Sequence, residues 1–85
     1  MNEQAIAPDE RVVDVRIIDP GVRHTIIQQL FSHLRDGQTL QLVVDHNPRR
    51  LKLLLEAGSG GRFSWDDLES GPDVWRVRIG RGGHA

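Results

Sequence analysis

The segment Leu40–Ala57, L-Q-L-V-V-D-H-N-P-R-R-L-K-L-L-L-E-A, determines how the chain folds. Its first part, Leu40–Val44, is short, apolar and rich in valine and leucine, which is typical of a buried strand. Asn47 and Pro48 follow, and a capping side chain before a proline is a common helix start. The next leucines recur at helical spacing: Leu51, Leu54 and Leu55. A strand is therefore predicted to turn directly into a helix that ends at Gly58.

The preceding residues repeat this arrangement. Arg11–Ile18 alternates between apolar and charged side chains, which predicts a strand with one covered and one solvated face. Asp19 and Pro20 then form the same capping pair as Asn47 and Pro48. Apolar residues at helical spacing follow: Ile26, Ile27, Leu30, Phe31 and Leu34. A first helix is predicted between this pair and Gly37.

Two further strands are predicted after the second helix, over Arg62–Leu68 and Val74–Ile79, with a Gly-Pro turn between them. The element order is βαβαββ, and a strand–helix–strand crossover makes the first two strands parallel. This order predicts an α+β two-layer sandwich, with two helices on one face of a four-stranded mixed sheet. We expect one domain over residues 11–81, a disordered arm over 1–10 and a disordered tail over 82–85.

The amino-acid composition excludes some classes of function and disfavours others. The chain has 85 residues, of which 38% are hydrophobic and 27% charged, and a formal net charge of −1. A nucleic-acid-binding domain usually has a basic excess, so this composition disfavours nucleic acid as a partner. The chain has no cysteine, which excludes disulfides and thiol chemistry. No apolar run has the length of a membrane span, and the N-terminus lacks a signal-peptide pattern, so we expect a cytoplasmic protein, either a monomer or a weak dimer.

Several short strings together resemble known families. They are V-D-V-R (13–16), R-H (23–24), D-H-N-P-R (45–49), G-R-F-S-W (61–65) and G-P-D-V-W-R-V-R-I (71–79). With the order βαβαββ, the chain resembles the TusA/SirA-like sulfur carriers. It is more similar to an uncharacterised bacterial family of that fold, known as a domain of unknown function. Members of that family occur alone or joined to hemerythrin-like or cupin-like domains. The similarity extends over Val12–Arg81.

The departures from these families limit what the resemblance implies. Sulfur carriers have a Cys-Pro pair at the start of the first helix, and in this chain Pro20 and Gly21 occupy those two positions. Persulfide transfer by the carrier mechanism is therefore excluded. Against the closer family, Ile17 replaces a glycine, Asp19 a proline and Asn47 an aspartate. The last change removes one carboxylate from the candidate site.

The candidate site lies at the edge where both helices are predicted to begin. Ligand sites in such folds gather at the carboxyl ends of parallel strands, and helix N-termini attract anions through free N–H groups and partial positive charge. The residues that this topology brings to the edge are Arg16, Arg23, His24, Asp45, His46, Asn47, Arg49 and Arg50. The chain is therefore predicted to be a non-enzymatic binding or adaptor module without a cofactor. Its partner would be a small anionic ligand or an acidic segment of another protein.

Two other interpretations remain open. His24, His46 and Asp45 have the side chains of a metal site, so the domain could be a metal- or redox-linked accessory domain. The helix N-termini and arginines around them oppose a divalent cation. RNA contact by the open face of the sheet is the second interpretation, because that face would carry Arg76 and Arg78 beside the aromatic residues Phe63, Trp65 and Trp75. Taken singly, each site residue also has an ordinary structural role as a helix cap, an ion-pair partner or a solvated charge.

Overall fold

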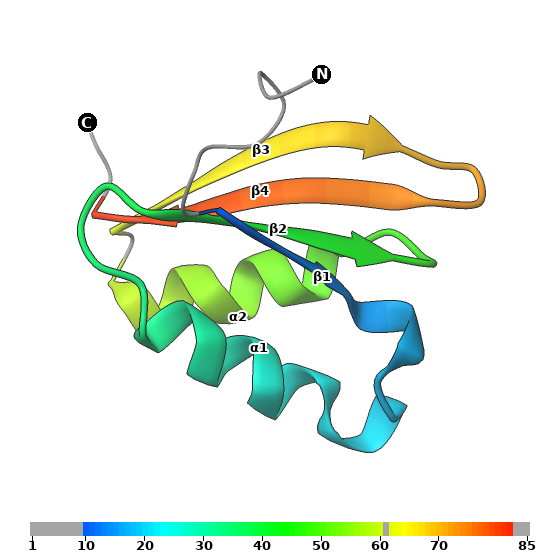
Figure 1. Cartoon of the computed structure of the whole chain (residues 1–85), viewed down its shortest axis with the longest axis horizontal. Coiled ribbons are helices and arrows are strands. Elements are labelled where there is room, and N and C mark those ends of the chain that lie inside the picture. Colours follow the sequence, from blue (N-terminus) through cyan, green and yellow to red (C-terminus); the bar gives the residue numbers. More distant parts are fainter. Residues whose placement is uncertain (1–9, 61, 83–85) are drawn as a thin grey trace.

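The computed structural model describes residues 10–60 and 62–82, and two helices cover one face of its four-stranded mixed sheet (Figure 1). The strands are β1 (Arg11–Asp14), β2 (Thr39–Val44), β3 (Phe63–Ser70) and β4 (Trp75–Arg81). The helices are α1 (Arg23–Ser32) and α2 (Arg49–Ser59), and two short 3-10 helices, η2 (Val15–Ile17) and η3 (Pro20–Val22), precede α1. The predicted α+β two-layer sandwich with the order βαβαββ is confirmed.

The sheet has the strand order β1-β2-β4-β3. β1 and β2 are parallel, with Arg11 opposite Leu40, and α1 provides the crossover between them. β4 is antiparallel to both β2 and β3. The prediction that the first two strands are adjacent and parallel is therefore confirmed. As a result, the C-terminal ends of β1 and β2 lie at the same edge of the sheet, close to the starts of both helices (Figure 1).

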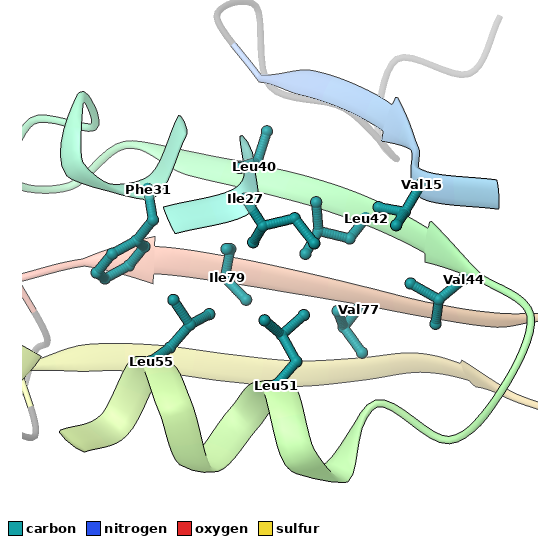
Figure 2. Close-up of a cluster of buried hydrophobic side chains, with 10 residues drawn as sticks. All are labelled: Val15, Ile27, Phe31, Leu40, Leu42, Val44, Leu51, Leu55, Val77 and Ile79. Atoms are coloured by element: carbon teal, nitrogen blue, oxygen red, sulfur yellow. The ribbon is translucent and has the colours of Figure 1, made fainter. Parts of the chain in front are cut away.

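The core lies between the sheet and the two helices (Figure 2). Alternate residues of the central strands point toward the helices because side chains on a strand alternate between its faces. Among them, Leu42 of β2 and Val77 and Ile79 of β4 have no exposed surface. The helices contribute Ile27 and Phe31 from α1, and Leu51 and Leu55 from α2. Truncating one such buried leucine to alanine typically costs about 2–5 kcal/mol.

The first strand is shorter than predicted and ends at Asp14 rather than Ile18. The carboxylate of Asp14 accepts hydrogen bonds from the backbone N–H of Arg16 at 3.1 Å and from its guanidinium at 2.8 Å. Such a local side-chain bond competes with strand pairing, and the chain turns into η2. Ile17, predicted to face the core, is consequently 82% exposed.

The first helical segment is divided, and its predicted bounds need correction. Asp19 caps η3, since its carboxylate accepts a hydrogen bond from the N–H of Gly21 at 2.9 Å. The α-helix begins only at Arg23. It ends at Ser32, before the predicted stop at Gly37. Gly37 has a positive φ of 88° and lies in the turn before β2, where its N–H donates to Arg81.

The later elements extend further than predicted. α2 continues through Gly58 to Ser59, and Gly60 forms its left-handed C-cap with φ 67°. β3 and β4 reach Ser70 and Arg81, each past its predicted end. The residues assigned to a loose arm, 1–10, lie outside the described range except for Glu10, which is buried. Of the predicted tail, only Gly82 is described, and its N–H donates to the carbonyl of Arg62.

Candidate functional site

A hollow of about 670 Å³ lies at the sheet edge where α1 and α2 begin, and we call it the helix-start pocket. Its polar lining consists of Arg23, His24, His46, Asn47, Arg49 and Arg50. Its apolar lining consists of Val15, Ile27, Val44, Pro48, Leu51 and Leu53. Most of the apolar lining residues are buried, whereas Leu53 is 58% exposed, so the pocket combines cationic side chains with one exposed leucine.

The fold brings six of the eight predicted site residues into this lining, and the other two, Arg16 and Asp45, lie outside it. Arg16 is occupied by Asp14, which binds its guanidinium through both carboxylate oxygens. That ion pair lowers the pKa of Asp14 to about 2. Asp45 contacts two lining residues, Arg23 and His46. The fold thus brings most of the predicted residues to one pocket, and their role in ligand binding stays a prediction.

Arg23 is the most firmly positioned cation of the pocket. Its Nε donates to the carbonyl of Ile18 at 2.8 Å, and its Nη2 donates to the carbonyl of Arg16 at 3.3 Å. Its Nη1 lies 3.8 Å from Asp45 Oδ1, and only 16% of its side chain is exposed. The guanidinium therefore stays in place without a ligand, and the nearby carboxylate offsets part of its charge.

Asp45 and His46 form a hydrogen-bonded pair, with 2.8 Å between Nδ1 of the ring and Oδ1 of the carboxylate. Adjacent residues on a strand point to opposite faces, but β2 ends at Val44, and the turn that follows allows the contact. The hydrogen bond from His46 lowers the pKa of Asp45, and the charge of Arg23 adds to this effect. Asp45 is thus held ionised beside the pocket, and His46 keeps Nε2 available for a ligand.

Both α-helices begin without a side-chain cap. The N-cap positions are occupied by Val22 and Pro48, and neither N-terminus has a side-chain capping hydrogen bond. The prediction that Asn47 caps the second helix is therefore wrong. The helix starts one residue later than predicted, which leaves Asn47 in the turn and Pro48 in the cap position. Backbone N–H groups at both helix starts consequently lack the partner that a cap would supply.

The charges in these first turns oppose the helix dipoles. Neither helix has an acidic residue in its first turn, and their first two positions are instead Arg23 and His24 in α1, and Arg49 and Arg50 in α2. Each cation at a helix N-terminus is unfavourable by about 0.3–1 kcal/mol at an exposed site. Within the described part of the chain, Arg49 and Arg50 have no ion pair to offset this. Residues that are locally unfavourable for stability and line a pocket, as these arginines do, are typical of functional sites.

The three side chains proposed for a metal do not form a recognisable centre. Over residues 10–60 and 62–82 there is no group of three or more His, Cys, Asp or Glu side chains arranged to hold a metal ion. His46 uses Nδ1 to contact Asp45, and His24 lies in the first turn of α1. This arrangement does not favour a three-ligand centre of His24, His46 and Asp45.

The face of the sheet opposite the helices is less open than its sequence predicted. Gln41 and Val43 point to this face but are only 3% and 5% exposed. Arg78 donates to both carboxylate oxygens of Glu10, at 2.7 and 3.1 Å, and Gln41 donates to Glu10 at 2.9 Å. Burial alone raises the pKa of Glu10, but hydrogen bonds from Arg78, Thr39 and Gln41 lower it to about 2.

Arg76 on the same face also has protein partners. Its Nε lies 3.9 Å from a carboxylate oxygen of Glu69, and its Nη1 donates to Gln41 at 3.4 Å. Arg78 is paired with Glu10 at 2.7 Å. Both arginines considered for RNA contact therefore neutralise carboxylates of this chain, which favours a structural role for them. Trp65 and Trp75 pack against the core on the other face.

Sequence reasoning missed two features of this region. Glu10 was assigned to a loose arm, although it continues the alternation of β1 and lies next to Thr39 in the parallel register. That alternation was the available signal. Leu53 was not selected because it lies off the buried side of α2, yet it lines the helix-start pocket and is 58% exposed.

The fold and the pocket define a small α+β domain with a cationic hollow at one sheet edge. The family of uncharacterized conserved proteins designated DUF2249 matches residues 12–81, so the chain belongs to this family. No curated protein and no solved structure gives a significant match. Among the helices of the described residues, none has the length and apolarity needed to span a membrane.

Proposed function

We propose that the protein is a non-enzymatic binding or adaptor module that recognises an anionic group, or an acidic segment of a partner, in the helix-start pocket. One observation carries this proposal. The polar lining has three arginines and two histidines but no carboxylate. Guanidinium groups bind carboxylates and phosphates through paired hydrogen bonds, so a lining of this kind recognises anions of either type.

The uncapped helix starts support the same ligand. Helix N-termini bind anions through backbone N–H groups and the helix dipole, and an anion here would contact both. It would also relieve the repulsion between the dipoles and the three arginines at the helix starts, Arg23, Arg49 and Arg50. An anion would therefore take the place of the missing caps.

The lining offers little for catalysis. A covalent mechanism needs a nucleophile beside a general base, and no lining residue has a hydroxyl or thiol. We further propose that the fold is of the TusA/SirA-like type and that the domain, a cytoplasmic bacterial protein, keeps the carrier's ligand edge without its cysteine. The order βαβαββ supports this relationship.

A metal- or redox-linked role through His24 and His46 is the second candidate. Both histidines line the pocket, and Asp45 holds Nδ1 of His46 at 2.8 Å. Carboxylates commonly orient metal-binding histidines in this way, because the held Nδ1 directs Nε2 toward the metal. A site of this type would need ligands beyond these two side chains, and the surrounding arginines oppose it.

Isothermal titration calorimetry with sodium phosphate and with zinc chloride distinguishes the two candidates. Phosphate is expected to bind and to raise the melting temperature, since a ligand of the native state stabilises it. The double variant Arg49→Gln/Arg50→Gln should lose this response. Arg62→Gln, which removes an arginine of a second hollow at the other end of the helices, is the matched control and should keep it.

The opposite pattern would support the metal role. Stoichiometric zinc binding that is lost in His24→Ala/His46→Ala, with no response to phosphate, would contradict the anion proposal. Imidazole ligands must be deprotonated, so such binding would also weaken as the pH falls through the imidazole range. Phosphate binding that survives Arg49→Gln/Arg50→Gln would place the anion elsewhere and contradict the proposed site.

A further inference from the structure

The lining of the helix-start pocket includes one exposed apolar side chain, Leu53, that an inorganic anion would not use. We infer that its ligand is an organic anion, a carboxylate or phosphate ester with a compact apolar body, whose charged end binds the arginines and whose body contacts Leu53. This inference rests on the proposed function and adds the class of ligand. It follows from the volume of the pocket and from the place of one exposed leucine.

The volume is too large for a small inorganic anion alone. The pocket measures about 670 Å³. Sites that enclose small organic molecules are typically about 300–1,000 Å³ and combine a mainly apolar lining with a few placed polar groups. Phosphate bound to Arg49 and Arg50 would leave Leu53, the exposed apolar side chain of the lining, in contact with water. An apolar body attached to the anion would displace that water.

Leu53 gives the second argument. α2 is amphipathic, with Leu51 and Leu55 buried in the core, whereas Leu53 is 58% exposed. Leu53 therefore lies outside the buried core, and its side chain is accessible at the pocket. Burying it against the apolar group of an amphipathic ligand would be favourable.

The polar and apolar linings also occur on the same short element. Arg49 and Arg50 lie in the first turn of α2, and Leu53 lies three residues after Arg50 and four after Arg49. Residues at these spacings share one face of a helix. A single molecule can therefore contact a guanidinium with its anionic end and Leu53 with its body.

Calorimetry with three matched compounds tests this inference: phenyl phosphate, inorganic phosphate and benzyl alcohol, at constant pH and ionic strength. Phenyl phosphate is expected to bind at least about tenfold more tightly than inorganic phosphate, the change expected from burying part of an aromatic ring. Benzyl alcohol, which has the ring without the charge, is expected to give no measurable binding.

The substitution Leu53→Ser should reduce the advantage of phenyl phosphate to less than about threefold and leave the affinity for inorganic phosphate unchanged. Leu54→Ser is the matched control, because Leu54 is 37% exposed on the same helix but lines the second hollow. It should keep the full advantage. Circular dichroism and thermal unfolding of both variants confirm that each is folded, and neither residue belongs to the buried core.

The outcomes separate this inference from the proposed function. Equal affinity for phenyl phosphate and inorganic phosphate, or an advantage that Leu53→Ser leaves intact, would overturn the ligand class while the anion proposal stands. Binding of neither phosphate compound would overturn both. Benzyl alcohol binding as tightly as phenyl phosphate would show an apolar site without charge recognition, and would also overturn both.

Discussion

Replacing Arg50 with glutamate reverses the charge in the first turn of α2, and we expect it to stabilise the protein while it abolishes anion binding. Arg50 is exposed, has no ion pair among the described residues and lines the helix-start pocket. Its positive charge lies at the positive end of the helix dipole. The substitution therefore replaces a repulsive interaction with an attractive one.

The expected gain can be worked from the dipole interaction. A charge in the first turn contributes about 0.3–1 kcal/mol at an exposed site, and the reversal counts this interaction twice. We therefore expect the free energy of unfolding to rise by about 0.6–2 kcal/mol. Each kcal/mol raises the melting temperature of a domain of this size by about 4–8 °C. In the same variant the new carboxylate should repel phosphate and remove its stabilising effect.

Urea unfolding at low ionic strength, followed by tryptophan fluorescence, measures the first effect, and calorimetry with phosphate measures the second. Arg62→Glu is the matched control, since it changes the formal net charge from −1 to −3 as well but lies beyond the end of α2. The control should show no gain in stability and should still bind phosphate. The reasoning is refuted if Arg50→Glu is destabilised, or if it binds phosphate as tightly as the unmodified protein.

Three further predictions concern stability and sulfur chemistry. Because the folded-state pKa of Glu10 is about 2, below the ordinary 4.5, its interactions stabilise the protein above pH 4.5 and are lost as the pH falls toward 2. Glu10→Gln should therefore lower the free energy of unfolding by about 2 kcal/mol at pH 7 and by much less near pH 2. The control Glu56→Gln, on the surface of α2, should have little effect on the free energy of unfolding at either pH. Gly71→Ala should lower the free energy of unfolding in urea by more than about 1 kcal/mol, because Gly71 has φ 72° and an added Cβ would lie 2.7 Å from Trp75. Gly58→Ala is the control: a Cβ there meets open space within α2, so it should stabilise the protein by about 0.4–1 kcal/mol. Incubation with a cysteine desulfurase and labelled cysteine should leave the intact mass unchanged, because the chain has no thiol, and an added sulfur would contradict this.

The element order could be predicted because strong local signals agreed with one another. The buried run of β2 and the leucines of α2 gave unambiguous periods, and a strand–helix–strand order permits few topologies. The ends of the elements were predicted less well. At Asp14 a side-chain bond to the next residue but one ended the strand, although the apolar alternation continued to Ile17. Whether a side-chain hydrogen bond or strand pairing prevails depends on local geometry, which cannot be predicted from the alternation of apolar and polar residues.

The polar residues of the candidate site could be predicted from the sequence for a topological reason. Residues after β2 and at the start of α1 meet because parallel strands end at one edge, so Arg23, His24 and Arg49 could be grouped before their distances were known. The place of Leu53 in the pocket could not be predicted, because a helical pattern of apolar residues does not indicate what an exposed leucine contacts. The pairing of Glu10 with Arg78 depends on a sequence separation of 68 residues, which single-sequence patterns do not detect.

An amide NMR titration with sodium phosphate tests the central claim most directly. The predicted result is saturable shifts at residues 22–24 and 47–50, where α1 and α2 begin, with little change at the opposite ends of the helices around Ser32 and Ser59. Sodium chloride at the same ionic strength is the control and should not reproduce the pattern. Shifts spread evenly over the surface, or a response confined to residues outside the helix-start pocket, would contradict the claim that this pocket recognises anions.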